Sequence, residues 1–243
     1  MSRKEISPKK QIVQAYEKIS SSYLKLKSKP WKDFRAYLSV ARKAVALPDE
    51  GIILDVGSGN GRNLLLFDEK KWQFIISDLS KKLLESAIIL PAGRKHLLNN
   101  DMSLLPIKKD SIDLVLCIAA LHHLENKKDT VKVLEDIHYS LKKGGYLILS
   151  CWRKWKADTR KKMLIDFLLY AFKKVKNRKW RHGDIIIPWL NEKKEVVAER
   201  YYHLFTKREL ISLITKTNFK IKNISILGGK SKKDNLFFLV FKD

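Results

Sequence analysis

The sequence has 243 residues, of which 45% are hydrophobic and 10% aromatic, a composition that supplies a sizeable core and excludes a wholly disordered chain. No run of about 18 apolar residues is present, so we expect no transmembrane helix, and the polar start MSRKEISPKK lacks the apolar run of a secretory signal. Two cysteines, Cys117 and Cys151, exclude a disulfide framework and an all-cysteine zinc site. A reduced, cytoplasmic protein without a metal site is therefore the default expectation.

The formal net charge of +24 is unevenly distributed along the chain. Residues 1–44 carry 12 basic and 3 acidic side chains, and residues 151–182 carry 12 and 2, whereas residues 45–150 carry 14 of each. A lysine-rich genome would explain many lysines but not the neutral middle. Clustered positive charge is typical of proteins that bind a polyanion, most often a nucleic acid. A merely solvated basic surface is the alternative.

The first elements predicted along the chain are helices. Ser7 and Pro8 form a helix start, with an N-cap followed by proline at the first helical position. Apolar residues from Ile12 to Ile19 then recur at helical spacing. Residues 34–47 predict a second helix that ends at Pro48. We expect residues 1–48 to form a helical cap.

Short apolar runs then alternate with helical segments. Because continuous apolar strands separated by helices form a parallel sheet covered on both faces, this alternation predicts an α/β fold. The predicted strands are Gly51 to Val56, Trp72 to Ile76, His96 to Asn99, Ile112 to Ala119 and Tyr146 to Ser150, and the predicted helices are 60–69, 80–90 and 128–142.

The last third departs from this alternation. Residues 153–182 are basic and rich in aromatic residues, and we interpret 153–199 as an insertion within a single domain that spans residues 1–243. Thr206 to Glu209 is a capping box that predicts a helix over 207–217. Two final strands, Phe219 to Ile226 and Asn235 to Phe241, are expected to form an antiparallel pair.

The most specific local motif, Asp55-Val56-Gly57-Ser58-Gly59-Asn60-Gly61, directly follows the first strand. Its spacing is G-x-G-x-G, with Arg62 where a dinucleotide fingerprint has its third glycine, and it lacks the Gly-Lys-Ser/Thr of a P-loop. Asp78 closes the second strand, where an acid can accept both ribose hydroxyls of an adenosine. The loop alone is compatible with any nucleotide-binding turn.

The order strand, acidic glycine loop, helix, strand, acid resembles that of the S-adenosylmethionine-dependent methyltransferases. Asn100-Asp101-Met102 and the strand SIDLVL at 111–116 extend the resemblance, although Asp101 by itself equally fits a helix cap. The resemblance implies a Rossmann-like fold, with a mostly parallel seven-stranded sheet and helices on both faces, and S-adenosylmethionine as cofactor. The cofactor-binding residues that it implies are Asp55, Gly57, Ser58, Gly59, Gly61, Asp78, Leu79, Asp101, Met102 and Ile118.

Further segments resemble one group, the tRNA wobble-uridine carboxymethyl methyltransferases. These segments are Gln14 to Ile19, Lys29-Pro30-Trp31, Ala119 to His123, Asp184 to Trp189, RYYHLF at 200–205 and Lys233-Asp234-Asn235. The resemblance implies that the carboxylate of 5-carboxymethyluridine in a tRNA anticodon is esterified to 5-methoxycarbonylmethyluridine, with a small zinc-binding activator subunit as partner. RYYHLF alone also fits a helix entry with core aromatics. Relatives often have cysteine at Ser58 and tend to have an arginine in the segment before Pro30, which here reads Lys27-Ser28-Lys29.

The chemistry of such a transfer requires position rather than a general base, because a carboxylate with a pKa of about 4 is ionised at neutral pH. A planar guanidinium matches a carboxylate, so Arg200 is the first candidate catalytic residue, with His123 and Tyr202 beside it. Expected substrate contacts are Lys29, Trp31, His122 and Arg200. Either histidine equally fits a structural cap of its loop.

The basic flanks fit contacts to tRNA phosphates, with aromatic residues of 153–182 available to stack on anticodon bases. We expect the activator to dock on the sheet edge near His96 to Asn99 by strand addition. Two alternatives remain open: a methyltransferase that acts on a small molecule or a protein, and a catalytically silent relative that binds the donor and tRNA.

Overall fold

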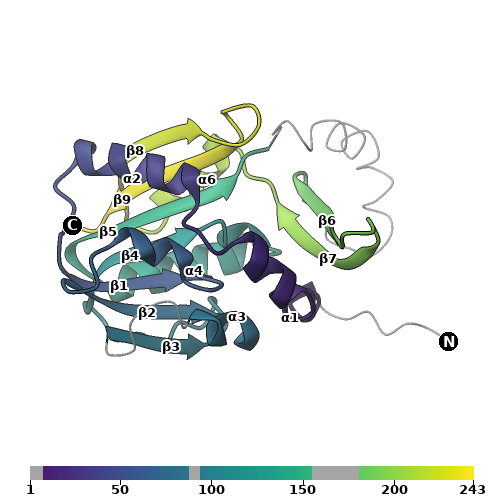
Figure 1. Ribbon diagram of the computed structural model, residues 1–243. Coiled ribbons are helices and arrows are strands. Elements are labelled where there is room, and N and C mark those ends of the chain that lie inside the picture. Colours follow the sequence, from purple (N-terminus) through teal and green to yellow (C-terminus); the bar gives the residue numbers. More distant parts are fainter. Residues whose placement is uncertain (1–7, 88–93, 155–180) are drawn as a thin grey trace.

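The protein is described here by a computed structural model that covers residues 8–87, 94–154 and 181–243 (Figure 1). A seven-stranded sheet with the order β3-β2-β1-β4-β5-β9-β8 forms its centre. The parallel strands are β1 (Gly51–Val56), β2 (Trp72–Asp78), β3 (Lys95–Asn99), β4 (Ile112–Ile118) and β5 (Leu141–Trp152). Strand β9 (Asn235–Phe241) lies antiparallel between β5 and β8 (Lys220–Leu227), which completes the predicted fold class.

Helices cover both faces of the sheet. One face packs against α4 (Lys127–Ser140) and α6 (Lys207–Thr215), and the other packs against α2 (Lys32–Ala44). Tyr37 of α2 stacks on Phe237 of β9 with ring centroids 4.7 Å apart, and both side chains are fully buried. These two apolar layers explain why the strand sequences are continuous apolar runs rather than alternating ones.

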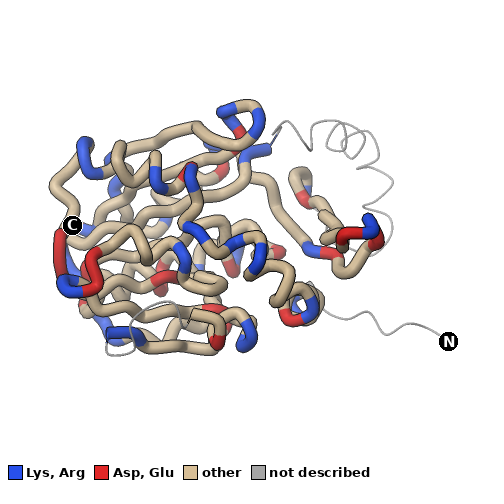
Figure 2. The backbone as a smooth tube through the Cα atoms, viewed as in Figure 1, with Lys and Arg blue, Asp and Glu red and all other residues tan. Residues whose placement is uncertain are grey.

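The N-terminal helix α1 (Pro8–Leu26) lies across the edge of the sheet to which the parallel strands point (Figure 1). It contacts α3 (Lys81–Glu85) on one side and strand β7 (Val196–His203) on the other. Its start at Pro8 agrees with the prediction, whereas Ser7 lies outside the described residues. Both N-terminal helices carry basic residues, lysines on α1 and both lysines and arginines on α2 (Figure 2).

Several predicted helices are shorter than expected. The segment 60–69 contains only a 3₁₀ turn, η1 (Arg62–Leu66), because Gly61 precedes it with φ 68° and Phe67 is already extended. Helix α3 ends at Glu85 and α2 at Ala44. The predicted capping box is confirmed, since the Thr206 hydroxyl accepts a hydrogen bond of 3.1 Å from the amide of Glu209.

A second, two-stranded sheet was not predicted. It consists of β6 (Asp184–Leu190) and β7 (Val196–His203), paired antiparallel. RYYHLF therefore begins in β7 and ends directly before Thr206, the N-cap of α6. The hairpin joins the main sheet where Phe205 exchanges hydrogen bonds with the backbone around Trp152. Of the predicted basic segment 153–182, residues 155–180 lie outside the described part.

A buried polar cluster holds this hairpin. The carboxylate of Asp184 accepts from the Tyr201 hydroxyl (2.7 Å), the His203 ring (2.5 Å) and the Arg181 amide (2.7 Å). The second ring nitrogen of His203 lies 3.0 Å from Glu209 of α6. Because each partner is buried or half-buried, the hairpin is fixed to α6 by polar contacts that water does not replace.

No helix among the described residues is long and apolar enough to cross a membrane.

Replacement of Asp184 tests this cluster. We expect Asp184→Ala to lower the free energy of unfolding by about 3–5 kcal/mol, because it leaves buried donors and a charged Arg181 without their acceptor. Urea denaturation measures the change, and Glu192→Ala, at an exposed position of the same hairpin, is the matched control. A loss below about 1 kcal/mol would contradict the assignment, since that is the range of a solvent-screened contact.

Candidate active site

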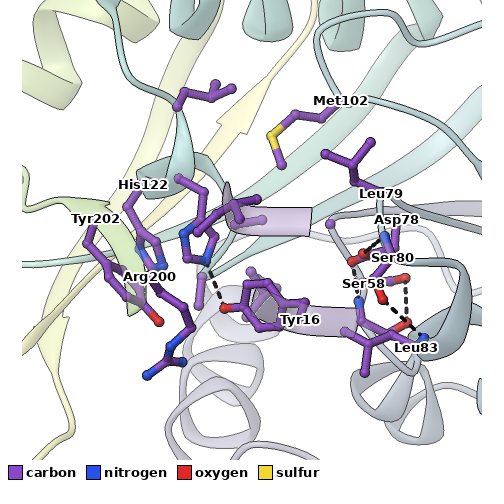
Figure 3. A pocket seen from close by; sticks show the side chains of 18 of the residues that line it. Tyr16, Ser58, Asp78, Leu79, Ser80, Leu83, Met102, His122, Arg200 and Tyr202 are labelled. Carbon is purple, nitrogen blue, oxygen red and sulfur yellow. Dashed lines mark hydrogen bonds between the residues drawn. The ribbon is translucent and has the colours of Figure 1, made fainter. Parts of the chain in front are cut away.

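A cavity of about 480 Å³ lies at the carboxyl ends of β1, β2 and β4, beneath α1. In parallel sheets this edge is where ligands bind, and the volume is within the range of small-molecule sites. The cavity has two ends separated by Tyr16 of α1: Asp78 and Ser80 lie on one side of this ring, and Arg200 and Tyr202 lie on the other (Figure 3).

The glycine loop forms the wall at the first end. Gly57 and Gly59 have φ values of 67° and 61°, a region that side chains disfavour. A Cβ atom at Gly57 would lie 2.4 Å from the Cβ of Ala120 and 3.3 Å from the Met102 methyl group. The loop is held in place because the amides of Gly57 and Ser58 both donate to the carbonyl of Ser77, at 2.8 and 3.0 Å. Only glycine permits this close approach of backbone to the cavity.

Asp78 is fixed at the end of β2 by the loop that it faces. Its carboxylate accepts from the amides of Gly59 (2.7 Å) and Ser80 (2.8 Å). Burial raises the pKa of this carboxyl, and the amide hydrogen bonds oppose part of that rise. The acid thus lines the cavity in a fixed orientation that suits a pair of vicinal hydroxyls.

Residues after β3 complete this end. The hydroxyl of Ser77 donates to Asn100 at 2.7 Å, and the amide of Ser103 donates to Asp101 at 2.9 Å. Asp101 also pairs with Lys9 of α1. Asp101 and Met102 both line the cavity.

Asp55 lies behind this wall rather than in it. Its side chain is 1% exposed, and its Oδ2 atom has no hydrogen-bond partner among the described residues. Burial raises its pKa to about 8, and the neighbouring charge of Asp78 contributes to the rise. Gly61 likewise does not line the cavity; its positive φ of 68° allows the chain to turn into η1.

The second end of the cavity is built around the guanidinium of Arg200. Its Cζ atom lies 4.8 Å from the ring centroid of Trp189, 5.4 Å from that of Tyr202 and 6.0 Å from that of Tyr16. The residue is 8% exposed, and its Nε atom has no hydrogen-bond partner in the described part of the chain. None of the ion pairs formed by described residues involves Arg200. A buried cation thus stands in an aromatic box to which the described residues contribute no counter-ion.

His123 holds one wall of this box. Its Nδ1 atom lies 2.9 Å from the carbonyl oxygen of Tyr201, which can only accept, so Nδ1 carries the proton. The other nitrogen, Nε2, then accepts from the Tyr16 hydroxyl at 3.0 Å. Burial lowers the pKa of His123 to about 4. His123 is therefore neutral, and both of its nitrogens are engaged within the protein in the arrangement described.

His122 lies deeper, against aromatic neighbours. Its Nδ1 atom accepts from the amide of Trp152 at 3.3 Å. The Trp152 ring stacks on Tyr202 with centroids 4.5 Å apart and an interplanar angle of 3°. His122 lines the cavity together with these two rings, which give this end a flat, apolar lining.

Most of the predicted site residues meet in this one cavity, and three do not. Asp55, Gly61 and Lys29 are outside the lining, and the Lys29 side chain is exposed. The predicted residues that line the cavity are Gly57, Ser58, Gly59, Asp78, Leu79, Asp101, Met102, Ile118, Trp31, His122, His123, Arg200 and Tyr202.

Sequence reasoning missed three contributors. Glu17 of α1 accepts from the Ser80 hydroxyl (2.7 Å) and the Lys82 amide (3.2 Å), and so attaches α1 beside Asp78. Lys27 and Arg62 line the cavity where Lys29 was expected. An acid next to the apolar stripe of α1 was a detectable signal for Glu17, whereas no local pattern distinguishes Lys27 from its neighbouring lysines.

Comparisons with known proteins agree with this geometry. Residues 54–149 match the family described as a methyltransferase domain. The tRNA (carboxymethyluridine(34)-5-O)-methyltransferase of Schizosaccharomyces pombe is 25% identical, and the match covers 96% of each chain. A solved S-adenosylmethionine-dependent methyltransferase of Methanosarcina mazei superposes with a TM-score of 0.65 at 21% identity, covering 84% of this chain and 96% of that one.

A third similar structure is a complex between the Haloferax volcanii Trm112 methyltransferase activator and a methyltransferase, with a TM-score of 0.61 at 13% identity that covers 95% of this chain and 96% of that one. Fold and site together define the chain as an S-adenosylmethionine-dependent methyltransferase of Rossmann-like fold. S-adenosylmethionine is its cofactor, and the resemblance to the tRNA wobble-uridine carboxymethyl methyltransferases is confirmed. The residues present fit this cofactor, because Gly57 leaves room for it against the loop and Asp78 faces the cavity.

The first prediction for this site concerns Gly57. We expect Gly57→Ala to weaken the binding of S-adenosylhomocysteine at least about tenfold, because the new Cβ collides with Ala120 and pushes the loop into the cavity. Isothermal titration calorimetry measures the affinity. Gly144→Ala is the control, since Gly144 also has a positive φ (82°) but has no atom within 4 Å of the added Cβ. Equal affinities for the two variants would contradict the role of Gly57.

The second prediction concerns the pH dependence of stability. Asp55 has a pKa of about 8 in the folded protein and an ordinary value of 3.8, so between these pH values the folded state retains a proton that the unfolded state has lost. The free energy of unfolding should then fall as the pH rises from 5 to 9. Asp55→Asn should lose this component and gain stability relative to the wild type towards pH 9.

Urea denaturation at pH 5, 7 and 9 measures the difference. Asp49→Asn, an exposed carboxyl nearby in the sequence, is the control and should follow the wild type. Parallel pH profiles for Asp55→Asn and the wild type would show that Asp55 is ionised in the folded state.

Proposed function

We propose that this methyltransferase esterifies the carboxylate of 5-carboxymethyluridine at the wobble position of tRNA, giving 5-methoxycarbonylmethyluridine. The observation that carries the proposal is the buried guanidinium of Arg200, which faces the cavity without a counter-ion among the described residues. The similarity to the S. pombe tRNA (carboxymethyluridine(34)-5-O)-methyltransferase supports the same reaction.

An isolated buried charge costs several kcal/mol unless a partner compensates for it. Aromatic faces at 4.8 to 6.0 Å offset part of this cost for Arg200. A carboxylate offsets the rest, because its two oxygens match the fork of a guanidinium. The flat walls provided by Trp189 and Tyr202 suit a planar base that carries this carboxylate. An anionic, aromatic acceptor therefore fits this end of the cavity.

The mechanism needs no general base. S-adenosylmethionine, when bound, supplies a methyl group activated by its sulfonium charge; the carboxylate oxygen forms the new bond to the methyl carbon as the bond to sulfur breaks. Burial keeps Tyr202 protonated by raising its pKa, so Tyr202 does not act as a base. The ionised carboxylate carries no proton that His123, which is neutral and already engaged through both ring nitrogens, would have to remove. The chain contributes position: alignment of two reactants accounts for about 7–11 kcal/mol of a barrier.

Arg200 must hold the acceptor without quenching it. Two N–H donors orient the carboxylate, while the aromatic box excludes water that would compete for the same donors. Tyr16, fixed by its hydrogen bond to His123, lies between Arg200 and the Asp78 end, so it sets the separation across which the methyl group is transferred (Figure 3).

The proposed partners follow from surface features. A net charge of +24 suits the phosphates of tRNA. An activator subunit, zinc-binding by resemblance, would add a strand at β3, an edge strand of the main sheet on which Leu97 is 48% exposed. The proposal also covers the organisation and location of the protein. It has one domain, with a helical cap (1–48) and an insertion (153–199). Its location is the cytoplasm.

Incubation with labelled S-adenosylmethionine and tRNA that contains 5-carboxymethyluridine tests the function. Nucleoside mass spectrometry should show 5-methoxycarbonylmethyluridine, and ribonuclease should abolish label transfer. The activator subunit is added in a parallel reaction. Label in a small molecule or in protein, without modified nucleoside under either condition, would overturn the proposal.

Replacement of Arg200 is the residue-level test. We expect Arg200→Ala to reduce transfer at least about 100-fold, the scale on which a charge-stabilising donor contributes, while S-adenosylhomocysteine binds within about threefold of the wild-type affinity. Single-turnover kinetics and calorimetry measure the two quantities. Arg208→Ala, at an exposed position on α6, is the control. Equal losses of transfer and donor affinity would show that Arg200 belongs to the cofactor end instead.

A further inference from the structure

The further cations in the cavity lining include Lys27, directly after α1, and Arg62, the first residue of η1. We propose that Lys27 and Arg62 form a second anion subsite beside Arg200, which binds the backbone phosphate of the nucleotide whose carboxylate Arg200 holds. This inference rests on the proposed function and names the part of the acceptor that a second site would recognise.

The two side chains come together because the segment between α1 and α2 is attached to the glycine loop. The Asn60 amide donates to the carbonyl of Lys27 at 3.1 Å, and Arg62 donates to the carbonyl of Lys29 at 3.4 Å. The amide of Trp31 donates to Asn63 at 3.1 Å. Three hydrogen bonds thus hold two segments together that lie more than 30 residues apart in sequence. Lys27 lies on one of these segments and Arg62 on the other.

The subsite has positive charge and no internal compensation. No ion pair among the described residues involves Lys27 or Arg62. Burial lowers the pKa of Lys27, and the positive charges of Arg62 and Arg200 lower it further, so the three cations are close enough to repel one another. An anion between them would relieve this repulsion, and so the site favours an anionic ligand.

Position distinguishes the two cationic sites. Arg200 is almost fully buried, whereas Lys27 and Arg62 are half-exposed at the wall of the cavity. A nucleotide has the same arrangement, with a base that enters a pocket and a phosphate that remains near solvent. Phosphate contacts fix the register of a nucleic acid without reading its sequence. The subsite would therefore seat the wobble nucleotide while Arg200 selects its carboxylate.

The α-carboxylate of the methyl donor is an oxyanion of the same kind, and the experiment must separate the two sources. Variants Lys27→Gln and Arg62→Gln each remove one charge. Lys70→Gln is the matched control, because Lys70 is exposed in the turn that precedes β2, at the opposite end of this strand from Asp78. Thermal unfolding verifies that all three variants are folded.

The first arm compares two acceptors, 5-carboxymethyluridine and its 3′,5′-bisphosphate. For the wild type and Lys70→Gln we expect kcat/KM to be at least about tenfold higher for the bisphosphate. This preference should fall to about threefold or less in Lys27→Gln and Arg62→Gln, with kcat/KM for the nucleoside little changed. A preference that survives in both variants would overturn the proposal.

The second arm measures tRNA and S-adenosylhomocysteine binding. Each of Lys27→Gln and Arg62→Gln should reduce the slope of log affinity for tRNA against log salt by about one, and Lys70→Gln should not. Affinity for S-adenosylhomocysteine should stay within about threefold of the wild type. A tenfold loss of that affinity with an unchanged salt slope would assign the subsite to the donor carboxylate, and this arm decides alone if the small acceptors react too slowly.

Failure of this inference is distinguishable from failure of the proposed function. If the wild type methylates tRNA carboxylates but the two variants behave as Lys70→Gln does, the function stands and the subsite falls. If the wild type transfers no methyl group to carboxylated tRNA, with or without the activator, both fall together.

Discussion

Under the proposed function, the site depends on one buried guanidinium that stays charged until an acceptor arrives, and the described residues supply it with no counter-ion. Arg200 meets these conditions because three aromatic rings, from α1, β6 and β7, surround it. A carboxylate in the box would neutralise the charge and close the site, and the described residues provide none there. The hairpin that carries Arg200 must then be rigid, and the buried carboxylate of Asp184 gives it polar anchors.

Helix α1 relates the two ends of the cavity to each other. Consecutive residues do this: Glu17 binds the turn that follows Asp78, and Tyr16 donates to His123 beside Arg200. Because these residues share one helical turn, the distance between Asp78 and Arg200 is set by a rigid element rather than by a loop. A small shift of α1 would therefore alter both ends together.

The sequence predicted the parts of the molecule that are encoded locally. Apolar runs identified the strands, and glycine spacing with Asp78 identified the cofactor end, because close backbone approach leaves a signature in the sequence itself. The β6–β7 hairpin was missed, since its strands are stabilised by contacts with distant α1 and α6. Lys29 was predicted to line the cavity, but Lys27 lines it instead, for a similar reason. Which of the two lysines faces inward depends on hydrogen bonds to Asn60 and Arg62, which lie far along the chain.

The two ends of the cavity carry side chains of opposite charge, and this difference affects product release. Asp78 and Asp101 line one end of the cavity, where the proposed reaction places a cationic sulfonium, and Arg200 lines the other, where it places an anionic carboxylate. Under the proposed reaction, one transfer converts the sulfonium to a neutral thioether and the carboxylate to a neutral ester. Both products thereby lose the attraction that held their precursors. The field that favours the substrates therefore does not retain the products, so the same residues assist binding and release.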